Sequence, residues 1–301
     1  MDYVKEILTL KKEKNAIILA HNYQPPYIQD IADYIGDSLE LCLNAKRARA
    51  KLIVFCGVRF MAETAAILNP KTPVILPEPL HSTCSLAKML LPFHLKKLRE
   101  EYPNAKVVLY INTSAEAKAE ADCICTSANA ARVVNAMDSE VIIFGPDVNL
   151  LYHVKKQTSK LLIPAVSNGH CPPHVNITLK TIKSAKALHP KAEVIVHPET
   201  PPEVQDFADH VASTSGILKY CKTSDAGEFI IGTENGMLYR LNKEMPNKKF
   251  YPASPHAICS GMKTITLPKL FEALENEKNI VEVENSIAKR ARDAIENMLR
   301  L

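Results

Sequence analysis

The sequence predicts an α/β fold made of three similar αβα units with short parallel sheets. Short, continuously apolar segments alternate with helical segments along the chain, which is typical of buried parallel strands. Landmark residues also recur at one spacing, since Cys171 lies 87 residues after Cys84 and 88 residues before Cys259. A shared period indicates one structural unit used three times. We therefore expect a pseudo-threefold arrangement of the units around a common centre.

The repeat divides the chain more finely than its length does. By length alone, 301 residues would suggest about two domains. The spacing instead predicts three units, each contributing one of the spaced cysteines, and a C-terminal tail helix that packs back on the first unit. The predicted bounds are 1–104, 105–191 and 192–275 for the units and 276–301 for the tail.

The elements of the first unit follow from its apolar runs and helical periodicity. We expect strands over residues 16–20, 52–55 and 73–76. We expect helices over residues 2–14, 27–50, 59–68 and 85–101. A proline-rich loop over 77–84 ends at Cys84.

The second and third units repeat this plan. The second has predicted strands over 106–110, 141–144 and 161–163, a helix ending near residue 137, and helices over 147–157 and 177–188. The third has predicted strands over 193–196, 228–231 and near residue 250, a helix after residue 215, and helices over 234–241 and 267–274. The tail helix is predicted over 285–299 from the apolar stripe Ile287, Ala291, Ile295 and Met298.

The composition is that of an ordinary soluble protein, with 47% hydrophobic and 23% charged residues. A net charge of +4 with scattered lysines does not favour nucleic-acid binding. No apolar run approaches the roughly 18 residues of a membrane span, and the first residues lack the pattern of a signal peptide. We therefore expect a cytoplasmic protein whose eight cysteines stay reduced. Neither a G-x-G-x-x-G motif nor a P-loop is present.

The three spaced cysteines, here called the loop cysteines (Cys84, Cys171 and Cys259), each end a proline-rich loop after the third strand of a unit. A single free cysteine is most often a small buried apolar residue. Three thiolates at matched positions can instead hold zinc or three corners of a [4Fe–4S] cubane. A zinc site would usually need a fourth protein ligand, and none is evident. The pattern favours a central metal-cluster site with one open iron, which Lewis-acid catalysis needs. The remaining cysteines are expected to be structural: Cys42, Cys56, Cys123, Cys125 and Cys221.

Polar residues follow the first strand of each unit in pairs separated by one residue. The pairs are His21/Tyr23, Tyr110/Asn112 and His197/Glu199. Residues i and i+2 of an extended chain share a face, so all three pairs should point the same way. A strand-end histidine is often only a satisfied polar residue of the core. Three such pairs after three apolar strands instead indicate acid–base groups and hydrogen-bond donors around one pocket.

Hydroxyl residues keep the same period before three further helices. Ser127 lies 89 residues after Ser38, and Thr214 of the pair Thr214-Ser215 lies 87 residues after Ser127 of the pair Thr126-Ser127. These residues can be plain helix caps. Helix N-termini and hydroxyl groups also bind phosphate or carboxylate, and both roles are compatible.

Taken together, these residues make the whole chain similar to the quinolinate synthase family. The motifs that carry the resemblance are A-H-N-Y at 20–23, G-D-S at 36–38, Y-I-N at 110–112, C-T-S-A-N at 125–129, G-H-C at 169–171, H-P-E at 197–199, S-T-S-G at 213–216, and the loops that end at Cys84 and Cys259. The resemblance implies three αβα domains around a [4Fe–4S] cluster. It implies a condensing and dehydrating enzyme, a transferase of NAD (pyridine nucleotide) biosynthesis, that joins iminoaspartate and dihydroxyacetone phosphate to give quinolinate, phosphate and water. It further implies that an aspartate oxidase or dehydrogenase supplies the iminoaspartate.

The resemblance also implies roles, residue by residue. The loop cysteines would ligate the cluster. His21, Ser38 and Ser127 would lie at a substrate phosphate or carboxylate. The residues expected around the substrate carbons and carboxylates are Tyr23, Tyr110, Asn112, His174, His197 and Thr214. Glu199 would be the general acid–base group, with Tyr110, His197 and Tyr23 completing the catalytic set.

Two other readings fit three thiolates. One is another three-cysteine cluster enzyme, such as a reductive dehydroxylase of isoprenoid synthesis, which would depend on a source of electrons. The other is a non-enzymatic iron–sulfur or zinc sensor. A sensor should bind a partner or nucleic acid, and no basic recognition helix stands out in the sequence.

Overall fold

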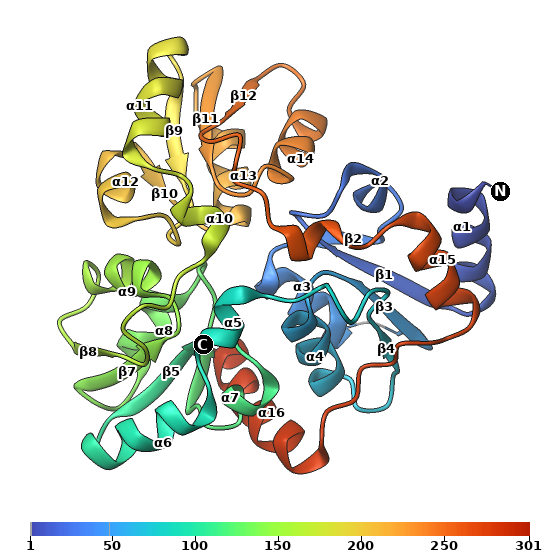
Figure 1. Cartoon of the computed structure of the whole chain (residues 1–301), viewed down its shortest axis with the longest axis horizontal. Coiled ribbons are helices and arrows are strands. Elements are labelled where there is room, and N and C mark those ends of the chain that lie inside the picture. Colours follow the sequence, from blue (N-terminus) through green and yellow to red (C-terminus); the bar gives the residue numbers. More distant parts are fainter. Residues whose placement is uncertain (1, 48) are drawn as a thin grey trace.

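The computed structural model describes residues 2–47 and 49–301. It confirms the α/β class, with three four-stranded sheets whose strands all pair in parallel. The sheets lie in three lobes around the middle of the molecule, as Figure 1 shows. The chain passes through the lobes in sequence order.

Each sheet has the same strand order, in which the first strand lies between the second and third. The first sheet is β2-β1-β3-β4, the second β6-β5-β7-β8 and the third β10-β9-β11-β12. Their strands are β1 (Ala16–His21), β2 (Tyr34–Gly36), β3 (Leu52–Cys56), β4 (Val74–Ile75), β5 (Lys106–Tyr110), β6 (Cys123–Cys125), β7 (Val141–Gly145), β8 (Leu161–Pro164), β9 (Glu193–Val196), β10 (His210–Val211), β11 (Glu228–Gly232) and β12 (Lys249–Pro252). Because the second and third strands lie on opposite sides of the first, successive connections leave the first strand in opposite directions. Ligands of such sheets are expected at the carboxyl end of the strand where this change of direction occurs.

The second strand of each sheet was missing from the sequence prediction. The predicted helix over 27–50 is in fact α2 (Pro26–Gln29), then β2, then α3 (Ser38–Arg47). The edge strands β2, β6 and β10 have only two or three residues, which is too short for a detectable apolar pattern.

One aspartate repeats before each of these edge strands. Asp33, Asp122 and Asp209 each accept a hydrogen bond from a backbone N–H of the neighbouring first strand, at 2.8, 2.7 and 2.8 Å. In each case the two residues are 15 apart in sequence. A carboxylate thus closes the crossover and fixes the register of the edge strand. This repetition is direct structural support for three copies of one unit.

The helix predicted over 85–101 is divided in two. It forms α5 (Ser85–Met89) and α6 (Pro92–Glu101), because Pro92 lacks the N–H needed to continue a helix and begins a new one instead. The predicted helix over 177–188 likewise begins later, as α11 (Leu179–Leu188) capped by Thr178, after the short α10 (Pro172–Val175).

The remaining helices agree in place with the predicted ones or fill the short crossovers. They are α1 (Tyr3–Glu13), α4 (Arg59–Leu68), α7 (Ala115–Lys118), α8 (Ala130–Ala136), α9 (Val148–Lys155), α12 (Pro202–Phe207), α13 (Thr214–Thr223), α14 (Met237–Glu244), the 3-10 helix η1 (Ser260–Lys263), α15 (Leu267–Glu275) and α16 (Asn285–Arg300).

The helix after each cysteine loop packs on the next lobe of the ring. Helix α6 contacts α7 of the second lobe, and α11 contacts α12 and β11 of the third. Helix α15 returns to the first lobe and packs along α1, where the rings of Tyr3 and Phe271 lie 5.7 Å apart edge to face. The two helices lie side by side in Figure 1. The cysteine loops therefore lie at the junctions between lobes, and α15 closes the ring.

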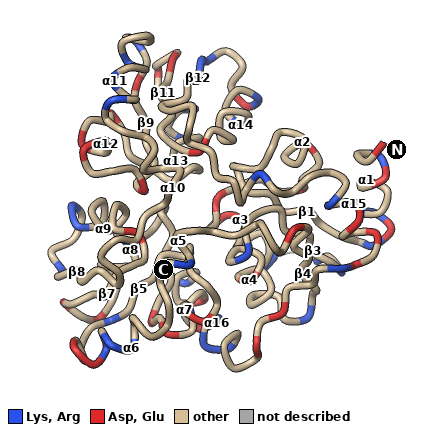
Figure 2. The backbone as a smooth tube through the Cα atoms, viewed as in Figure 1, with Lys and Arg blue, Asp and Glu red and all other residues tan. Residues whose placement is uncertain are grey.

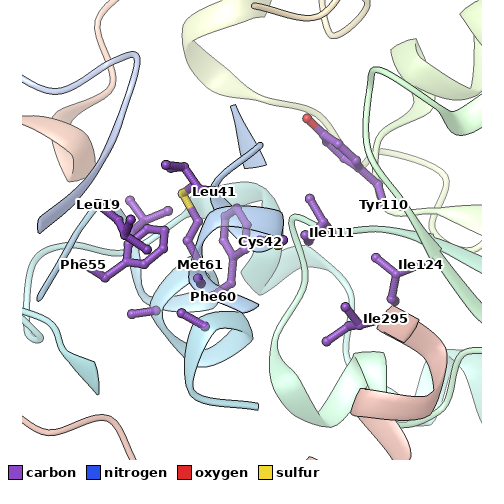
Figure 3. Packing of buried hydrophobic residues seen from close by; sticks show 14 of the residues in the cluster. Leu19, Leu41, Cys42, Phe55, Phe60, Met61, Tyr110, Ile111, Ile124 and Ile295 are labelled. Carbon is purple, nitrogen blue, oxygen red and sulfur yellow. The ribbon is translucent and has the colours of Figure 1, made fainter. Parts of the chain in front are cut away.

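The tail helix α16 joins two lobes. Asn297 donates to the carbonyl of Asp122 in the second lobe at 2.9 Å, and Arg292 donates to the carbonyl of Ile67 in the first at 2.7 Å. Its buried Ile295 lies next to Ile124 of β6 (Figure 3). We expected this helix on the first unit, and it contacts the second as well.

The cores are mainly apolar, and most charged side chains lie outside them; Lys118 and Asp147 are buried exceptions. Figure 3 shows Leu19, Phe55, Phe60 and Met61 packed between the first sheet and its helices. Lysine, arginine and acidic residues are scattered over the outer helices and loops, as Figure 2 shows. Within the described residues, no helix combines the length and apolar character that crossing a membrane requires.

Candidate functional site

The carboxyl ends of the first strands from all three lobes meet at one cavity. The space inside it that a water-sized sphere can reach is only about 60 Å³, so the cavity is narrow. Every candidate residue named from the sequence lines it: His21, Tyr23, Ser38, Cys84, Tyr110, Asn112, Ser127, Cys171, His174, His197, Glu199, Thr214 and Cys259. The structure thus brings the candidates together, and the individual roles given to them remain predictions. The wall also includes residues the sequence reasoning did not select, among them Asp37, Phe60, Glu234 and Met262.

The loop cysteines reach the cavity with nearly the same backbone geometry. Their φ/ψ angles are −109°/120°, −90°/112° and −90°/104°, and each cysteine precedes the first turn of a short helix. All three are half-buried, whereas the other five cysteines are buried. Only the loop cysteines therefore combine access to the cavity with a repeated local structure.

The loops are held close by glycines that leave no room for a side chain. A Cβ on Gly261 would lie 2.2 Å from the carbonyl oxygen of Thr83, directly beside Cys84. A Cβ on Gly169 would lie 1.8 Å from the carbonyl oxygen of Pro146. Close backbone approach of this kind requires glycine. These contacts seat the Cys259 loop against the Cys84 loop, and the Cys171 loop against the end of β7.

The loop cysteines are protonated as free thiols. Burial raises the pKa of Cys84 to about 12 and the pKa of Cys171 well above its usual range; Cys259 raises the pKa of Cys84 further, and Glu199, Cys84 and Cys259 raise that of Cys171 further. Burial also raises the pKa of Cys259. Backbone N–H groups of the following turn act in the opposite direction on Cys84 and Cys259. Thiols in this setting become thiolates when a metal replaces the proton.

A buried acidic residue lies beside each of two cysteine loops. The side chain of Glu234 accepts from the N–H of Cys259 at 3.1 Å and pairs with Lys263 at 2.8 Å. Asp147 is fully buried and caps α9 by accepting from the backbone N–H groups of Asn149 and Leu150 at 2.9 and 2.8 Å. The two acids lie 87 residues apart, each two residues after a strand-end glycine (Gly145 and Gly232). This spacing was the available signal, and the sequence reasoning missed it.

The Glu199 carboxyl contacts three other side chains of the cavity wall. Its Oε2 lies 3.0 Å from Nδ1 of His174 and 3.3 Å from Nδ1 of His197. Its Oε1 accepts from Nδ2 of Asn112 at 3.3 Å. Burial alone would raise the pKa of the Glu199 carboxyl, but His174 and the Tyr110 hydroxyl outweigh burial and lower it to about 2. The group is therefore a carboxylate at neutral pH and can accept a proton.

His21 and His197 are neutral. Burial lowers the pKa of each imidazole to about 3. Nδ1 of His21 accepts the N–H of Tyr23 at 3.2 Å, so the proton of the neutral ring is on Nε2. Nδ1 of His197 accepts the N–H of Glu199 at the same distance, and its Nε2 lies 3.1 Å from the Ser127 hydroxyl. Both rings can then act as hydrogen-bond donors without carrying charge.

A buried threonine connects two of the candidate residues and was not predicted. The Thr233 hydroxyl lies 2.6 Å from the Tyr23 hydroxyl and 2.9 Å from Nε2 of His174. Burial, with the nearby Glu199 charge, raises the pKa of Tyr23 and of Tyr110 well above the usual range. Both phenols therefore keep their protons and can serve as donors.

In each lobe, one buried side chain donates hydrogen bonds to backbone carbonyl groups of the loop that follows the first strand. Gln29 donates to the carbonyls of Asn22 and Gln24 at 3.1 and 2.9 Å, and Gln205 donates to those of Pro198 and Thr200 at 2.9 and 2.7 Å. Lys118 occupies the corresponding position in the second lobe and donates to the carbonyl of Thr113. These residues are 89 and 87 apart, another repeat that the sequence reasoning overlooked.

One compact group of possible metal ligands is also present. Ligand atoms of Cys171, His174 and Glu199 lie within 4.8 Å of one another. In this structure those atoms are hydrogen-bonded, since Nδ1 of His174 lies 3.1 Å from the sulfur of Cys171 as well as 3.0 Å from Glu199. The loop cysteines and this group share the same cavity, so a metal centre here would face the acid–base residues directly.

Comparison with known proteins extends over nearly the whole chain. Residues 5–300 match the family model described as quinolinate synthetase A protein. The chain belongs to the quinolinate synthase family. Similar family members include quinolinate synthases from Pyrococcus horikoshii, 54% identical over 301 residues, and Methanocaldococcus jannaschii, 51% identical over 305 residues. Each alignment covers 100% of this chain and 99% of the relative.

Membership of the quinolinate synthase family fits the site. The family consists of metal-dependent enzymes of NAD biosynthesis, and this member carries a set of possible metal ligands in the cavity where the three lobes meet. Another quinolinate synthase, from Methanothermobacter thermautotrophicus, is 51% identical over 298 residues, covering 99% of this chain and 97% of its own length. Family membership therefore agrees with the whole architecture rather than with one lobe.

Proposed function

We propose that this chain is a quinolinate synthase that condenses iminoaspartate with dihydroxyacetone phosphate, releasing phosphate and water, at a [4Fe–4S] cluster held by the loop cysteines. The observation that carries the proposal is the meeting of three half-buried thiols, one from each lobe junction, with a carboxylate, neutral imidazoles and protonated phenols in one cavity. The atoms of the two substrates equal those of quinolinate, phosphate and two water molecules, so the overall reaction needs no oxidant or reductant.

The spacing of the thiols supports a cluster over a single ion. Tetrahedral zinc with bonds of about 2.3 Å would require sulfur atoms roughly 3.8 Å apart. Among the described residues, the three loop cysteines do not form a group whose ligand atoms all lie within 4.8 Å. A cubane holds its thiolates further apart than one ion does, at different corners. When bound by three cysteines, such a cluster supplies one iron without a protein ligand, a Lewis acid for substrate oxygen or nitrogen.

The anionic groups of the substrates can be bound by neutral donors. The Nε2–H of His21 and the hydroxyls of Ser38, Ser127 and Thr214 all line the cavity. Thr214 is also the first residue of α13, so the N-terminus of that helix faces the same region. Neutral donors and a helix N-terminus favour phosphate and carboxylate oxygens.

Proton transfer is assigned to Glu199 and the phenols. As a carboxylate, Glu199 first acts as a base, taking a proton from carbon or nitrogen of the bound substrate. Tyr23 and Tyr110, which keep their protons, can donate hydrogen bonds to a leaving hydroxyl or to a carbonyl oxygen. The protonated Glu199 then returns its proton in dehydration, since several steps toward an aromatic ring require one. A positioned acid–base group contributes about 10²–10⁴-fold to such steps.

The proposal also covers the supply of iminoaspartate and the cellular location of the enzyme. Imines hydrolyse readily in water, which supports direct supply of iminoaspartate by an aspartate oxidase or dehydrogenase. Eight cysteines, free in this structure, suit a reducing compartment, which supports a cytoplasmic location.

Anaerobic assay of the cluster-loaded protein tests the proposal. Iminoaspartate generated in place, with dihydroxyacetone phosphate, should give quinolinate and an equal amount of phosphate without added reductant. A requirement for an electron donor would favour a reductive dehydroxylase. Absence of any product, together with tight binding of a macromolecule, would favour a sensor and refute the proposal.

A further inference from the structure

Asn22 breaks the threefold pattern at a buried position. It is the middle residue of the strand-end triplet His21-Asn22-Tyr23, and the residues at the same place in the other lobes are Ile111 and Pro198. The backbone is equivalent, since the N–H of Asn22 bonds to Gly36 at 3.1 Å and that of Ile111 bonds to Cys125 at 2.8 Å, in each case the last residue of the edge strand. Two lobes place an apolar side chain here, whereas the first buries an amide with no exposed surface.

The Asn22 amide lies between an arginine and a residue of the cavity wall. Arg240, on α14 of the third lobe, donates from Nη1 to Oδ1 of Asn22 at 2.6 Å and to the carbonyl of Ile35 at 3.1 Å. On its other side, Nδ2 of Asn22 donates to the Thr214 hydroxyl oxygen at 2.8 Å. The Arg240 side chain is only 16% exposed, so this chain of contacts is largely shielded from water.

The chemistry of these groups fixes every hydrogen along the chain. A guanidinium group has donors and no acceptor, so the amide must turn its oxygen toward Arg240 and its NH₂ toward Thr214. The Thr214 oxygen is therefore an acceptor in this contact, and its own hydrogen is free for another bond. Thr214 lines the catalytic cavity and is 2% exposed. The free hydrogen is available to a group bound there.

We infer that Asn22, oriented by Arg240, is a positioning residue that makes Thr214 a hydrogen-bond donor to an anionic oxygen of the substrate. The identity of the substrates rests on the proposed function; the donor role itself does not. The ligand chemistry is a carboxylate or a phosphate, because a hydroxyl with its hydrogen free and its oxygen already engaged recognises an acceptor. If the contacts of Asn22 served only to hold two lobes together, the direction of the Thr214 hydroxyl hydrogen would not matter.

The variant Asn22→Asp separates these two readings. Aspartate has the same shape and keeps its contact with Arg240, now as a charge-assisted pair, so the junction between lobes is preserved. It cannot donate to Thr214, and the threonine hydroxyl would turn to donate to Asp instead. The hydrogen needed by the substrate is then consumed. A hydrogen bond to a charged group is worth about 10–100-fold in affinity.

The test is a double-mutant cycle in the cluster-loaded enzyme. Asn22→Asp, Thr214→Val and the double variant are compared for the KM of each substrate, for kcat, and for binding of quinolinate and of inorganic phosphate by calorimetry. The control Tyr239→Phe removes the 2.7 Å bond from α14 to Asp30, another contact between the same two lobes, without involving Thr214. Unchanged cluster absorbance checks that each variant is folded.

The inference predicts a rise of about 10–100-fold in KM or Kd for one class of ligand in both single variants. The double variant should be no worse than Thr214→Val, and the control should resemble wild type. The substrate whose KM rises, and the probe whose Kd rises, distinguish a carboxylate from a phosphate. If Asn22→Asp binds normally, or if the two losses multiply as independent charge repulsion would, the inference is wrong. Wild-type protein that forms no quinolinate refutes the proposed function alone, because the binding measurements still decide the inference. Wild-type protein that binds neither probe refutes the inference too.

Discussion

Replacement of Glu199 by glutamine tests the central assignment of the active site. The change keeps the size and hydrogen-bonding reach of the side chain and removes its charge. In the wild type the carboxylate lies 3.0 Å from His174 and 3.3 Å from His197. As the base of the reaction it should contribute about 10²–10⁴-fold to turnover, which corresponds to about 3–5 kcal/mol of barrier. We expect that loss in kcat, with a normal cluster spectrum.

The same substitution should lower stability by an amount that depends on pH. The folded protein lowers the pKa of Glu199 from 4.5 to about 2, so the ionised form stabilises the fold above the pKa of the unfolded chain. That contribution, on the order of 3 kcal/mol, is lost as the pH falls from about 4.5 toward 2. Glutamine resembles the neutral form. The variant should therefore be less stable than wild type near pH 7, with the difference shrinking in acid.

Anaerobic quinolinate formation and urea unfolding measure the two effects. Glu203→Gln is the matched control, because this substitution makes the same chemical change at an exposed position of α12. It should leave turnover and stability unchanged. A Glu199→Gln enzyme that turns over at the wild-type rate would show that the base is another group, with His197 and Tyr110 the next candidates.

Three further predictions follow from the site. Protein purified anaerobically should contain about four irons and four sulfides per chain. Replacing any loop cysteine by alanine should remove or degrade the cluster, whereas Cys221→Ala should leave it intact. Stoichiometric zinc in protein made with ample iron and sulfide would contradict this prediction. Ser127→Ala should raise the KM for the triose phosphate more than that for the dicarboxylate, and equal losses for both would reduce Ser127 to a structural role. Since His21 and His197 have folded pKa values of about 3 and stay neutral, the unfolded chain binds more protons below pH 6.5. The free energy of unfolding should then fall by about 4 kcal/mol from pH 7 to 5, measured by urea titration, and a flat profile would refute the neutral assignment.

The main strands and the cavity residues could be predicted from the sequence because both follow the repeat. The continuously apolar runs at 16–20, 106–110 and 193–196 identify the first strands, and the residues just after them are where parallel sheets gather polar groups. The loop cysteines were found by spacing alone. Their meeting at one cavity follows from three equivalent units, and so needed no knowledge of how the lobes dock.

The features that were missed depend on contacts between lobes or on very short elements. The edge strand β10 has two residues, too few for any pattern, although the aspartate before it repeats. The Thr233 hydroxyl is hydrogen-bonded to Tyr23 of another lobe, and no local sequence pattern predicts such a contact. The packing of α15 on α1 also joins the two ends of the chain, which periodicity within one unit cannot predict.

The closing of the ring by α15 has a consequence for biosynthesis. Domains generally fold from the N-terminus as a chain is synthesised, and the first two lobes can form their sheets while the rest is still being made. Cys259 and α15, the helix that packs on α1, follow both of these lobes in the sequence. A nascent chain can therefore offer at most two of the three thiols until the third lobe has been synthesised. Insertion of the proposed cluster would then have to wait until all three lobes are present.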